Sequence, residues 1–380
     1  IPWSLVGSEM CIRDSVKGNI SVNLQDNIDR RLLRFMGDGA GYAYLSMQQA
    51  INDSGLENKD VSNVKSGLVV GSGGPSTSNM MKSFDTAREK SPKRVGPYMV
   101  PKCMSSTVSA NLANSFEIKG LNFSITSACS TSAHCITVGS DAIRNGTQDI
   151  IFAGGGEEIH WSLSVLFDAM AALSSKYNET PTLSSRPYDR DRDGFVISGG
   201  GGIIVLEELE HAKARGAKIY GELLGYGANS DGFDMVAPSG EGAERCMSLA
   251  MKGFDGKGIN QKVRYINGHG TSTPVGDVAE LKAINNLFGD QTEMPLLTST
   301  KSLTGHSQGA TGVQEAIYTL IMMNKNFISA NSNLSEPDEN IGEIKIPASL
   351  ISGFSHEACL SNSFGFGGTN ACLALGKYFN

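Results

Sequence analysis

The sequence predicts an α/β protein built from two similar halves. Short apolar runs rich in β-branched residues alternate with longer segments whose apolar residues recur at helical spacing. Such alternation is typical of layered folds whose sheets are largely buried. In each half a strand, a turn of small residues and a long helix follow one another, so we expect an internal duplication.

The composition is that of an ordinary globular protein. Hydrophobic residues make up 40% and charged residues 19% of the 380 residues, enough for a large core. The net charge of −7 argues against a nucleic-acid binder. The 7 cysteines show no C-x-x-C pair, which fits a reducing compartment and neither a disulfide framework nor a zinc site. No apolar run is long enough to span a bilayer, and we expect a cytoplasmic protein.

In the first half, we expect Gly37, Gly39 and Gly41 to break a helix whose firm part is 42–54, with Gly55 as its stop. The charged segment 76–94 is expected to be an exposed excursion. The other expected elements are a strand at 66–70, a helix at 105–118, a strand at 123–126, a helix at 133–143, strands at 149–153 and 194–207, and a helix at 208–216.

In the second half, strands and helices alternate more regularly. The expected elements are a strand from 220, a helix at 241–252, a strand at 264–267, a helix at 277–288, a strand at 296–300, a helix at 311–324, and strands at 359–364 and 371–375. Glycine-rich turns at 71–75 and 154–158 follow strands but complete no phosphate-binding motif, so tight turns are the better interpretation.

One cysteine lies where chemistry is expected. A predicted strand at 123–126 precedes Cys129, small residues surround it, and a predicted helix at 133–143 follows. At such a turn the free N–H groups and the helix dipole favour a thiolate. Small neighbours would let a substrate approach the sulfur, and backbone N–H groups could hold an oxyanion. An ordinary buried core cysteine is the alternative, and this stretch alone does not decide between them.

Two histidines, His269 and His306, also come just after predicted strands, where α/β proteins gather active-site residues. With Cys129 they could form a nucleophilic Cys–His pair, a metal site or unrelated core residues. The spacings match no common ligand motif and no carboxylate closely flanks either histidine, so a metal site is disfavoured. A cysteine protease fits by residue type but has no recognisable signature here.

Four longer motifs, at 126–134, 267–277, 301–309 and 362–370, resemble the β-ketoacyl-(acyl carrier protein) synthases in order and spacing. Details such as Ala133-His134-Cys135 look like synthase I more than synthase II. The resemblance implies the thiolase fold, with two similar halves in a five-layered arrangement. It implies a nucleophile half at 16–218 and a histidine half at 219–380.

The family resemblance implies an acyltransferase that elongates fatty acids by decarboxylative Claisen condensation. Cys129 would carry the acyl chain as a thioester, and the N–H groups of Cys129 and Phe366 would form an oxyanion hole. His269 and His306 would hold the malonyl thioester by donating hydrogen bonds. No metal, nucleotide or other cofactor is implied, because the substrates arrive on the phosphopantetheine of acyl carrier protein.

Further residues match supporting positions of that family. Lys301 and Glu315 match a buried ion pair, although a surface pair would be the ordinary interpretation. Thr271 and Thr273 match hydroxyls that contact the pantetheine arm. Phe366, between glycines, matches a gate.

The resemblance also implies two partners, acyl carrier protein and a second copy of the chain. Arg31, Arg34, Lys90 and Lys93 fall where the family docks its acidic carrier, and a local basic patch would suit that role. As scattered charges they would be solvated surface. A non-catalytic carrier-binding subunit is disfavoured because Cys129 and both histidines are present.

Residues 1–15 look foreign to the rest of the chain. They carry no clear periodicity and no signal-peptide order, and the family's first strand and glycine-rich turn should precede Val16. We therefore expect that one core strand of the first half is missing, leaving an inactive truncated relative as an alternative and organellar targeting open. Unpaired neighbours would make the chain fold or dimerise poorly.

Overall fold

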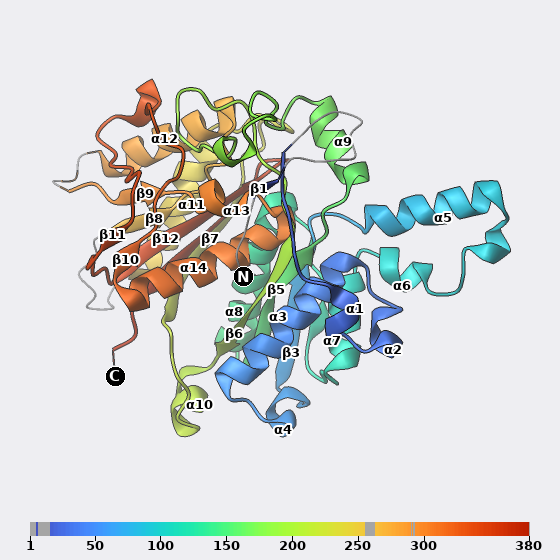
Figure 1. Cartoon of the computed structure of the whole chain (residues 1–380). Helices are drawn as coiled ribbons and strands as arrows, with labels where there is room; N and C mark the ends of the chain where they lie inside the picture. Colours follow the sequence, from blue (N-terminus) through green and yellow to red (C-terminus); the bar gives the residue numbers. More distant parts are fainter. Residues whose placement is uncertain (1–4, 7–15, 255–262, 290, 292, 380) are drawn as a thin grey trace.

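The computed structural model describes residues 5–6, 16–254, 263–289, 291 and 293–379. Two sheets enclose a central pair of helices, and further helices cover the outer faces, as Figure 1 shows. Three buried apolar clusters lie between the successive layers. This helix–sheet–helix–sheet–helix arrangement is the five-layered thiolase fold that the sequence predicted.

The sheet of the first half has the strand order β4-β3-β5-β6 within the described residues. Strands β3, β4 and β5 are parallel, and β6 is antiparallel to β5. Helices α3 and α7 cover its outer face, while α8 lies between the sheets. The elements are β3 (Ser66–Gly71), β4 (Asn122–Phe123), β5 (Ile150–Glu157), β6 (Gly200–Glu207), α3 (Asp38–Ser54), α7 (Thr107–Ser115) and α8 (Thr131–Arg144).

The sheet of the second half repeats this pattern with the order β7-β13-β12-β8-β9. Strands β9, β8 and β12 are parallel, β13 is antiparallel to β12, and β7 pairs with the far edge of β13. The elements are β7 (Glu222–Ser230), β8 (Tyr265–Asn267), β9 (Leu296–Thr298), β12 (Ala358–Gly365), β13 (Thr369–Gly376), the outer helices α11 (Glu241–Met251) and α12 (Pro274–Phe288), and the central helix α14 (Thr311–Lys325).

Smaller elements complete the chain. They are β1 (Leu5–Val6), β2 (Lys17–Gly18), α1 (Leu24–Asn27), α2 (Arg30–Leu33), α4 (Asn58–Val61), α5 (Thr77–Glu89), α6 (Met99–Cys103), α9 (Trp161–Ala169), α10 (Leu209–Ala214), α13 (Lys301–Thr304), β10 (Phe327–Ile328) and β11 (Ile351–Ser352). Among the described helices, none combines the length and hydropathy that a membrane span needs.

One predicted feature of the first half was wrong. Gly39 and Gly41 lie inside α3 and do not break it. A Cβ on Gly39 would lie 3.1 Å from the Glu158 nitrogen, so the glycine lets α3 pack directly on the end of β5. The excursion at 76–94 is exposed as expected, but most of it forms helix α5, which has no buried residue and projects from the body in Figure 1.

The predicted strands at 123–126 and 194–207 are longer than the observed β4 and β6. Most of the leader, 1–4 and 7–15, lies outside the described residues, so its foreign origin stays a prediction. In the second sheet, β7 pairs with the outer edge of β13. In the first sheet β6 has the position that corresponds to β13, but no strand of the described residues pairs with its outer edge. That edge lines an apolar groove of about 790 Å³ together with residues of α8 and α14.

Candidate active site

The nucleophile candidate lies in a tight turn between β4 and α8. Residues 128–130 form a short 3₁₀ turn, and Ala128 has a positive φ of 48°. The Thr131 hydroxyl accepts a hydrogen bond from the Ser127 N–H at 2.9 Å and donates one to the Ala128 carbonyl at 2.7 Å. These bonds fix the turn, so the Cys129 side chain is directed away from the helix and into the space between the halves.

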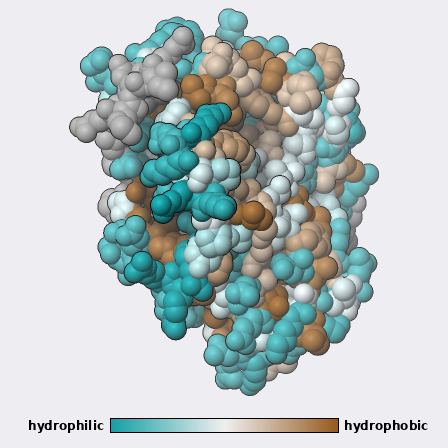
Figure 2. Space-filling view, turned by 90° about the vertical axis from the view of Figure 1, so that its right-hand side faces the viewer, coloured by the Kyte–Doolittle hydropathy of each residue, from teal (hydrophilic) through white to brown (hydrophobic). Residues whose placement is uncertain are grey.

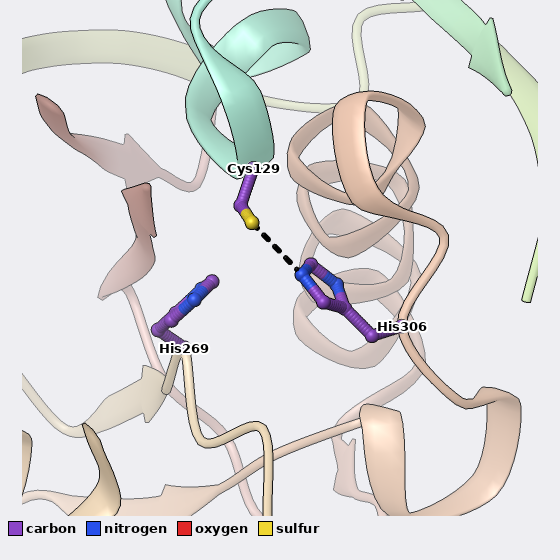
Figure 3. Close-up of side chains that lie close together, drawn as sticks. All are labelled: Cys129, His269 and His306. Atoms are coloured by element: carbon purple, nitrogen blue, oxygen red, sulfur yellow. Dashed lines mark hydrogen bonds between the residues drawn. The ribbon is translucent and has the colours of Figure 1, made fainter. Parts of the chain in front are cut away.

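The two histidines reach the same space from the second half. His269 directly follows β8, and its backbone N–H donates to Glu280 at 2.8 Å. His306 precedes α14, and its Nε2 lies 3.0 Å from Sγ of Cys129. One ligand atom from each of the three side chains lies within 4.8 Å of the others, and Figure 3 shows them facing one another. The structure therefore brings together the three residues that the sequence singled out.

Burial controls the protonation of this cluster. It raises the pKa of Cys129 to about 11, an effect that Lys301 and the N–H groups of Phe366 and Cys129 only partly oppose. The expectation that the helix N-terminus favours a thiolate was therefore wrong, because burial is the largest influence on the pKa of this thiol. Burial, followed by the charge of Lys301, holds the pKa of His269 and His306 well below the usual value. The resting site is a neutral thiol facing two neutral imidazoles.

A buried ion pair lies beneath the histidines. Lys301 Nζ is 2.5 Å from Glu315 Oε1, and both side chains are almost fully buried. Burial raises the pKa of Glu315 to about 7, although Lys301 opposes this. Of the two interpretations made from the sequence, the buried pair is correct and the surface pair is not.

The proposed pantetheine residues lie close to His269. The Thr271 and Thr273 hydroxyls are 3.1 Å apart. Asp277 at the start of α12 accepts from the backbone N–H groups of Thr271 at 3.0 Å and Thr273 at 3.3 Å. This carboxylate therefore fixes the shape of the loop that carries both threonines.

The gate candidate lies at the surface near the nucleophile. Phe366 is 39% exposed, and its ring centroid lies 6.3 Å from that of Phe167. Gly367 beside it has a φ of 84°, a conformation that favours glycine. A hydrogen bond from the Phe366 N–H to the Cys129 sulfur lowers the pKa of Cys129, so this segment borders the reacting atom.

The four docking candidates are all exposed but are not one cluster of free cations. Arg31 pairs with Asp29 at 2.9 Å, and its hydrogen bonds lower the pKa of that carboxyl to about 2. Arg34 lies over the ring of Tyr98 at 5.3 Å. Lys90 and Lys93 follow α5, and Figure 2 shows that hydrophilic and apolar areas alternate on the face turned to the viewer.

Sequence reasoning missed two residues that position the site. Thr311 at the start of α14 lies 3.0 Å from Nδ1 of His306. Glu157 at the end of β5 accepts from the N–H groups of Gly73 at 2.6 Å and Gly309 at 3.1 Å, joining the two halves beside Cys129. A glutamate at the end of an otherwise apolar strand was the available signal for Glu157. No local signal marked Thr311.

The fold and the three converging side chains define a ketosynthase-type enzyme of the thiolase fold. The family model for the β-ketoacyl synthase N-terminal domain matches residues 21–212, and the model for the C-terminal domain matches residues 220–335. The chain belongs to the β-ketoacyl synthase family. Whether the halves divide between 218 and 219, as expected, stays a prediction.

Curated relatives agree with this assignment. The chain is 54% identical to 3-oxoacyl-[acyl-carrier-protein] synthase 1 of Haemophilus influenzae, over 97% of this chain and 90% of that protein. It is 53% identical to the enzyme of the same name from Escherichia coli K12, over 96% and 89% of the two chains. A synthase 2 from Rhizobium meliloti is 40% identical over 89% of this chain and 80% of that protein.

Solved structures share the fold. A β-ketoacyl synthase from Burkholderia phymatum superposes with a TM-score of 0.88 at 33% identity, covering 96% of this chain and 88% of that one. A ketosynthase solved in complex with its type II polyketide acyl-carrier protein gives a TM-score of 0.81 at 26% identity, covering 90% and 85%.

Proposed function

We propose that this chain elongates fatty acids by condensing malonyl-acyl carrier protein with an acyl chain held on Cys129. The observation that carries the proposal is the approach of the Cys129 thiol to two neutral imidazoles, with Sγ and Nε2 of His306 3.0 Å apart. A thiol so placed can become an acyl thioester, and the histidines then face the second substrate.

In the acyl-transfer step, His306 removes the proton from the thiol. Because burial raises the pKa of Cys129 to about 11, little thiolate exists before a substrate arrives. Nε2 of His306 accepts the proton as sulfur attacks the acyl thioester, and the departing pantetheine thiol receives it. The N–H groups of Cys129 and Phe366 stabilise the oxyanion of the tetrahedral intermediate.

In the condensation step, His269 and His306 donate hydrogen bonds to the malonyl thioester oxygen as CO₂ leaves. Their low pKa values keep both rings neutral, so they act as hydrogen-bond donors and not as charged acids. The Thr311 hydroxyl can donate to or accept from Nδ1, so it fits either tautomer of His306. The resulting carbanion attacks the acyl carbon, and the Cys129 sulfur is the leaving group.

Three other groups support these steps. After burial, the charge of Lys301 is the next cause of the low pKa of both histidines, and Glu315 holds that lysine in place. Thr271 and Thr273 contact the pantetheine arm, and Phe366 gates entry to the nucleophile. The chain itself needs no cofactor for this chemistry, because the substrates are already activated as thioesters.

The function requires acyl carrier protein, and we propose that Arg31, Arg34, Lys90 and Lys93 contribute to its docking. A relative of the same fold was solved with its acyl-carrier protein, which supports such a partner. Because Asp29 neutralises the charge of Arg31, we expect Arg31 to contribute less to docking than Lys90 or Lys93.

We also propose a homodimer located in the cytoplasm. The two-residue strand β4 is an exposed edge of its sheet, with Phe123 37% exposed. Edge strands and apolar patches of this kind mark interfaces. Analytical ultracentrifugation should give a dimer, and a monomer at micromolar concentration would contradict this. A cooperative thermal transition of that dimer would refute the expectation that the chain folds or dimerises poorly.

The experiment for the function is intact-mass spectrometry after incubation with acyl carrier proteins carrying chains of graded length. We expect an acyl adduct on the wild-type chain that malonyl-acyl carrier protein consumes to give a 3-oxoacyl product. His269→Ala should still form the adduct but fail to consume it. A wild-type chain that forms no adduct, or one that malonyl-acyl carrier protein does not consume, would contradict the proposal.

A further inference from the structure

The three active-site donors also form a soft ligand set without a carboxylate. Sγ of Cys129 lies 3.0 Å from Nε2 of His306, and His269 completes a group whose ligand atoms lie within 4.8 Å of one another. An ion about 2.0 to 2.3 Å from each donor would separate trigonal donors by about 3.6 Å. The 3.0 Å between sulfur and Nε2 is about 0.6 Å shorter than that spacing, and the limit of 4.8 Å keeps the third donor in reach, so side-chain rotations would complete the coordination.

Contacts around the imidazoles suit them to bind a metal. The Thr311 hydroxyl, 3.0 Å from Nδ1 of His306, fixes that ring with Nε2 towards the sulfur. Metal-binding histidines are commonly held in this way through their second nitrogen. Nδ1 of His269 is buried and has no hydrogen-bond partner among the described residues, so no bond through that nitrogen restrains its ring.

The charge of the site selects among metals. The cluster is desolvated, and the buried ammonium of Lys301 adds positive charge beside it. A divalent ion on one thiolate would leave a net positive charge there, which burial penalises. A monovalent ion on one thiolate is neutral. Thiolate and imidazole ligands favour Cu(I), whereas Mg²⁺ and Ca²⁺ require oxygen donors that this group lacks.

We infer that Cys129, His269 and His306 form a three-coordinate Cu(I) site whose occupation blocks acyl transfer. The Cys129 S–H bond breaks and an S–Cu bond forms, the proton passes to the buffer, and copper stays Cu(I) throughout. The bound ion occupies the electron pair with which sulfur would attack a thioester. Copper binding needs only the geometry of the three side chains, whereas the inhibition rests on the proposed function.

The experiment titrates the full chain anaerobically with Cu(I) in competition with the chromogenic chelator bicinchoninate. We expect one tight equivalent, with copper X-ray absorption showing one sulfur and two nitrogen neighbours. Cys129→Ser and His306→Gln should each weaken that binding by about 100-fold or more. The matched control is Cys11→Ser/Cys103→Ser, because Cys103 is the other cysteine of the described residues that is not fully buried, and it should bind copper like the wild type.

Every other outcome of these experiments would contradict one named part of the inference. Tight binding that persists in Cys129→Ser, disappears in the control or shows only sulfur neighbours would overturn the site. Zn²⁺ bound as tightly as Cu(I) would overturn the charge argument. Acyl transfer that continues at full rate with one copper bound would overturn the inhibition. Failure of the copper-free chain to form an acyl adduct would instead count against the proposed function, because copper binding is measured separately.

Discussion

The two halves use the same local structure to place different chemistry. After β4, Ala128 with a φ of 48° leads through a 3₁₀ turn into α8, and after β9, Gln308 with a φ of 46° leads through a 3₁₀ turn into α14. A serine precedes each of these residues, and a threonine begins each helix. Non-glycine residues rarely adopt positive φ, so the shared conformation supports a duplicated turn.

The equivalent turns differ at one decisive position, where the first half has Cys129 and the second has Gly309. A Cβ on Gly309 would lie 2.1 Å from the Gly73 nitrogen, so the second turn has no room for a side chain there. Glu157 binds the N–H groups of both glycines and closes that contact. The first turn places the Cys129 sulfur in the active site. The second turn packs against backbone at Gly309, and His306, just before this turn in the sequence, enters the active site instead. A duplicated scaffold thus yields an asymmetric active site.

Removing the sulfur should have the largest effect. Cys129→Ala should form no acyl-enzyme and lower condensation by about 10⁴-fold or more, because no other group can carry the acyl chain. Intact-mass spectrometry and a product assay measure both quantities. Cys103→Ala is the matched control and should retain the adduct. Persistent labelled acyl-enzyme in Cys129→Ala would mean that the two turns do not divide their roles as described.

Adding a side chain at the equivalent position of the other half should cost stability. Gly309→Ala places a Cβ 2.1 Å from the Gly73 nitrogen and 2.8 Å from its Cα, and backbone cannot move aside easily. We expect a loss of about 3 kcal/mol in unfolding free energy, measured by urea denaturation. In Gly74→Ala the added Cβ has no atom within 4 Å, so this control should change little. Equal stabilities of the two variants would contradict the close backbone contact.

The local parts of this comparison could be predicted from the sequence. Apolar periodicity and turn residues predicted the strands and helices around Cys129, His269 and His306, because each depends on neighbours in the chain. The motif at 301–309 also placed Lys301 correctly. The general rule that α/β folds gather functional residues at strand ends favoured convergence of the three side chains, and the family resemblance implied it.

The parts that failed depend on contacts between distant segments. Gly39 was predicted to break α3, but its helix packs so closely on β5 that the glycine is needed there. The thiol of Cys129 was expected to ionise, but burial by both halves decides its pKa. The roles of Glu157 and Thr311 arise from partners that are far away in the sequence or on the facing element. Periodicity contains no information on such contacts.

The carboxyl that joins the two turns should make stability depend on pH. Burial raises the pKa of Glu157 from 4.5 to about 7, so between these values the folded chain holds a proton that the unfolded chain has lost. Stability should therefore fall as the pH rises through this window. Glu157→Gln can donate to Ser72 while its oxygen accepts from both glycines, so this variant should lose the fall, a relative gain of about 3 kcal/mol at pH 8. Parallel pH profiles of unfolding free energy for the two chains would contradict the assignment.

The smallest effects are expected from replacing the threonines that begin the two central helices, and the two replacements should affect different properties. Thr311→Val leaves Nδ1 of His306 without its hydroxyl partner, so we expect kcat to fall about 10-fold with KM little changed. Thr131→Val leaves the Ser127 N–H unpaired and should cost about 1 kcal/mol of stability, with a smaller effect on kcat.

Nitrogen NMR of the histidine rings provides the readout that a purely structural role would not change. Because the Thr311 hydroxyl is hydrogen-bonded to Nδ1 of His306, Thr311→Val should alter the ring-nitrogen shifts of that residue, and Thr311→Ser should restore them. Thr131→Val should leave those shifts in place while lowering the midpoint of urea unfolding. If both valine variants changed kcat and the histidine shifts alike, the two turns would be acting as one structural unit. The division between a turn that positions the nucleophile and a turn that positions its base would then be wrong.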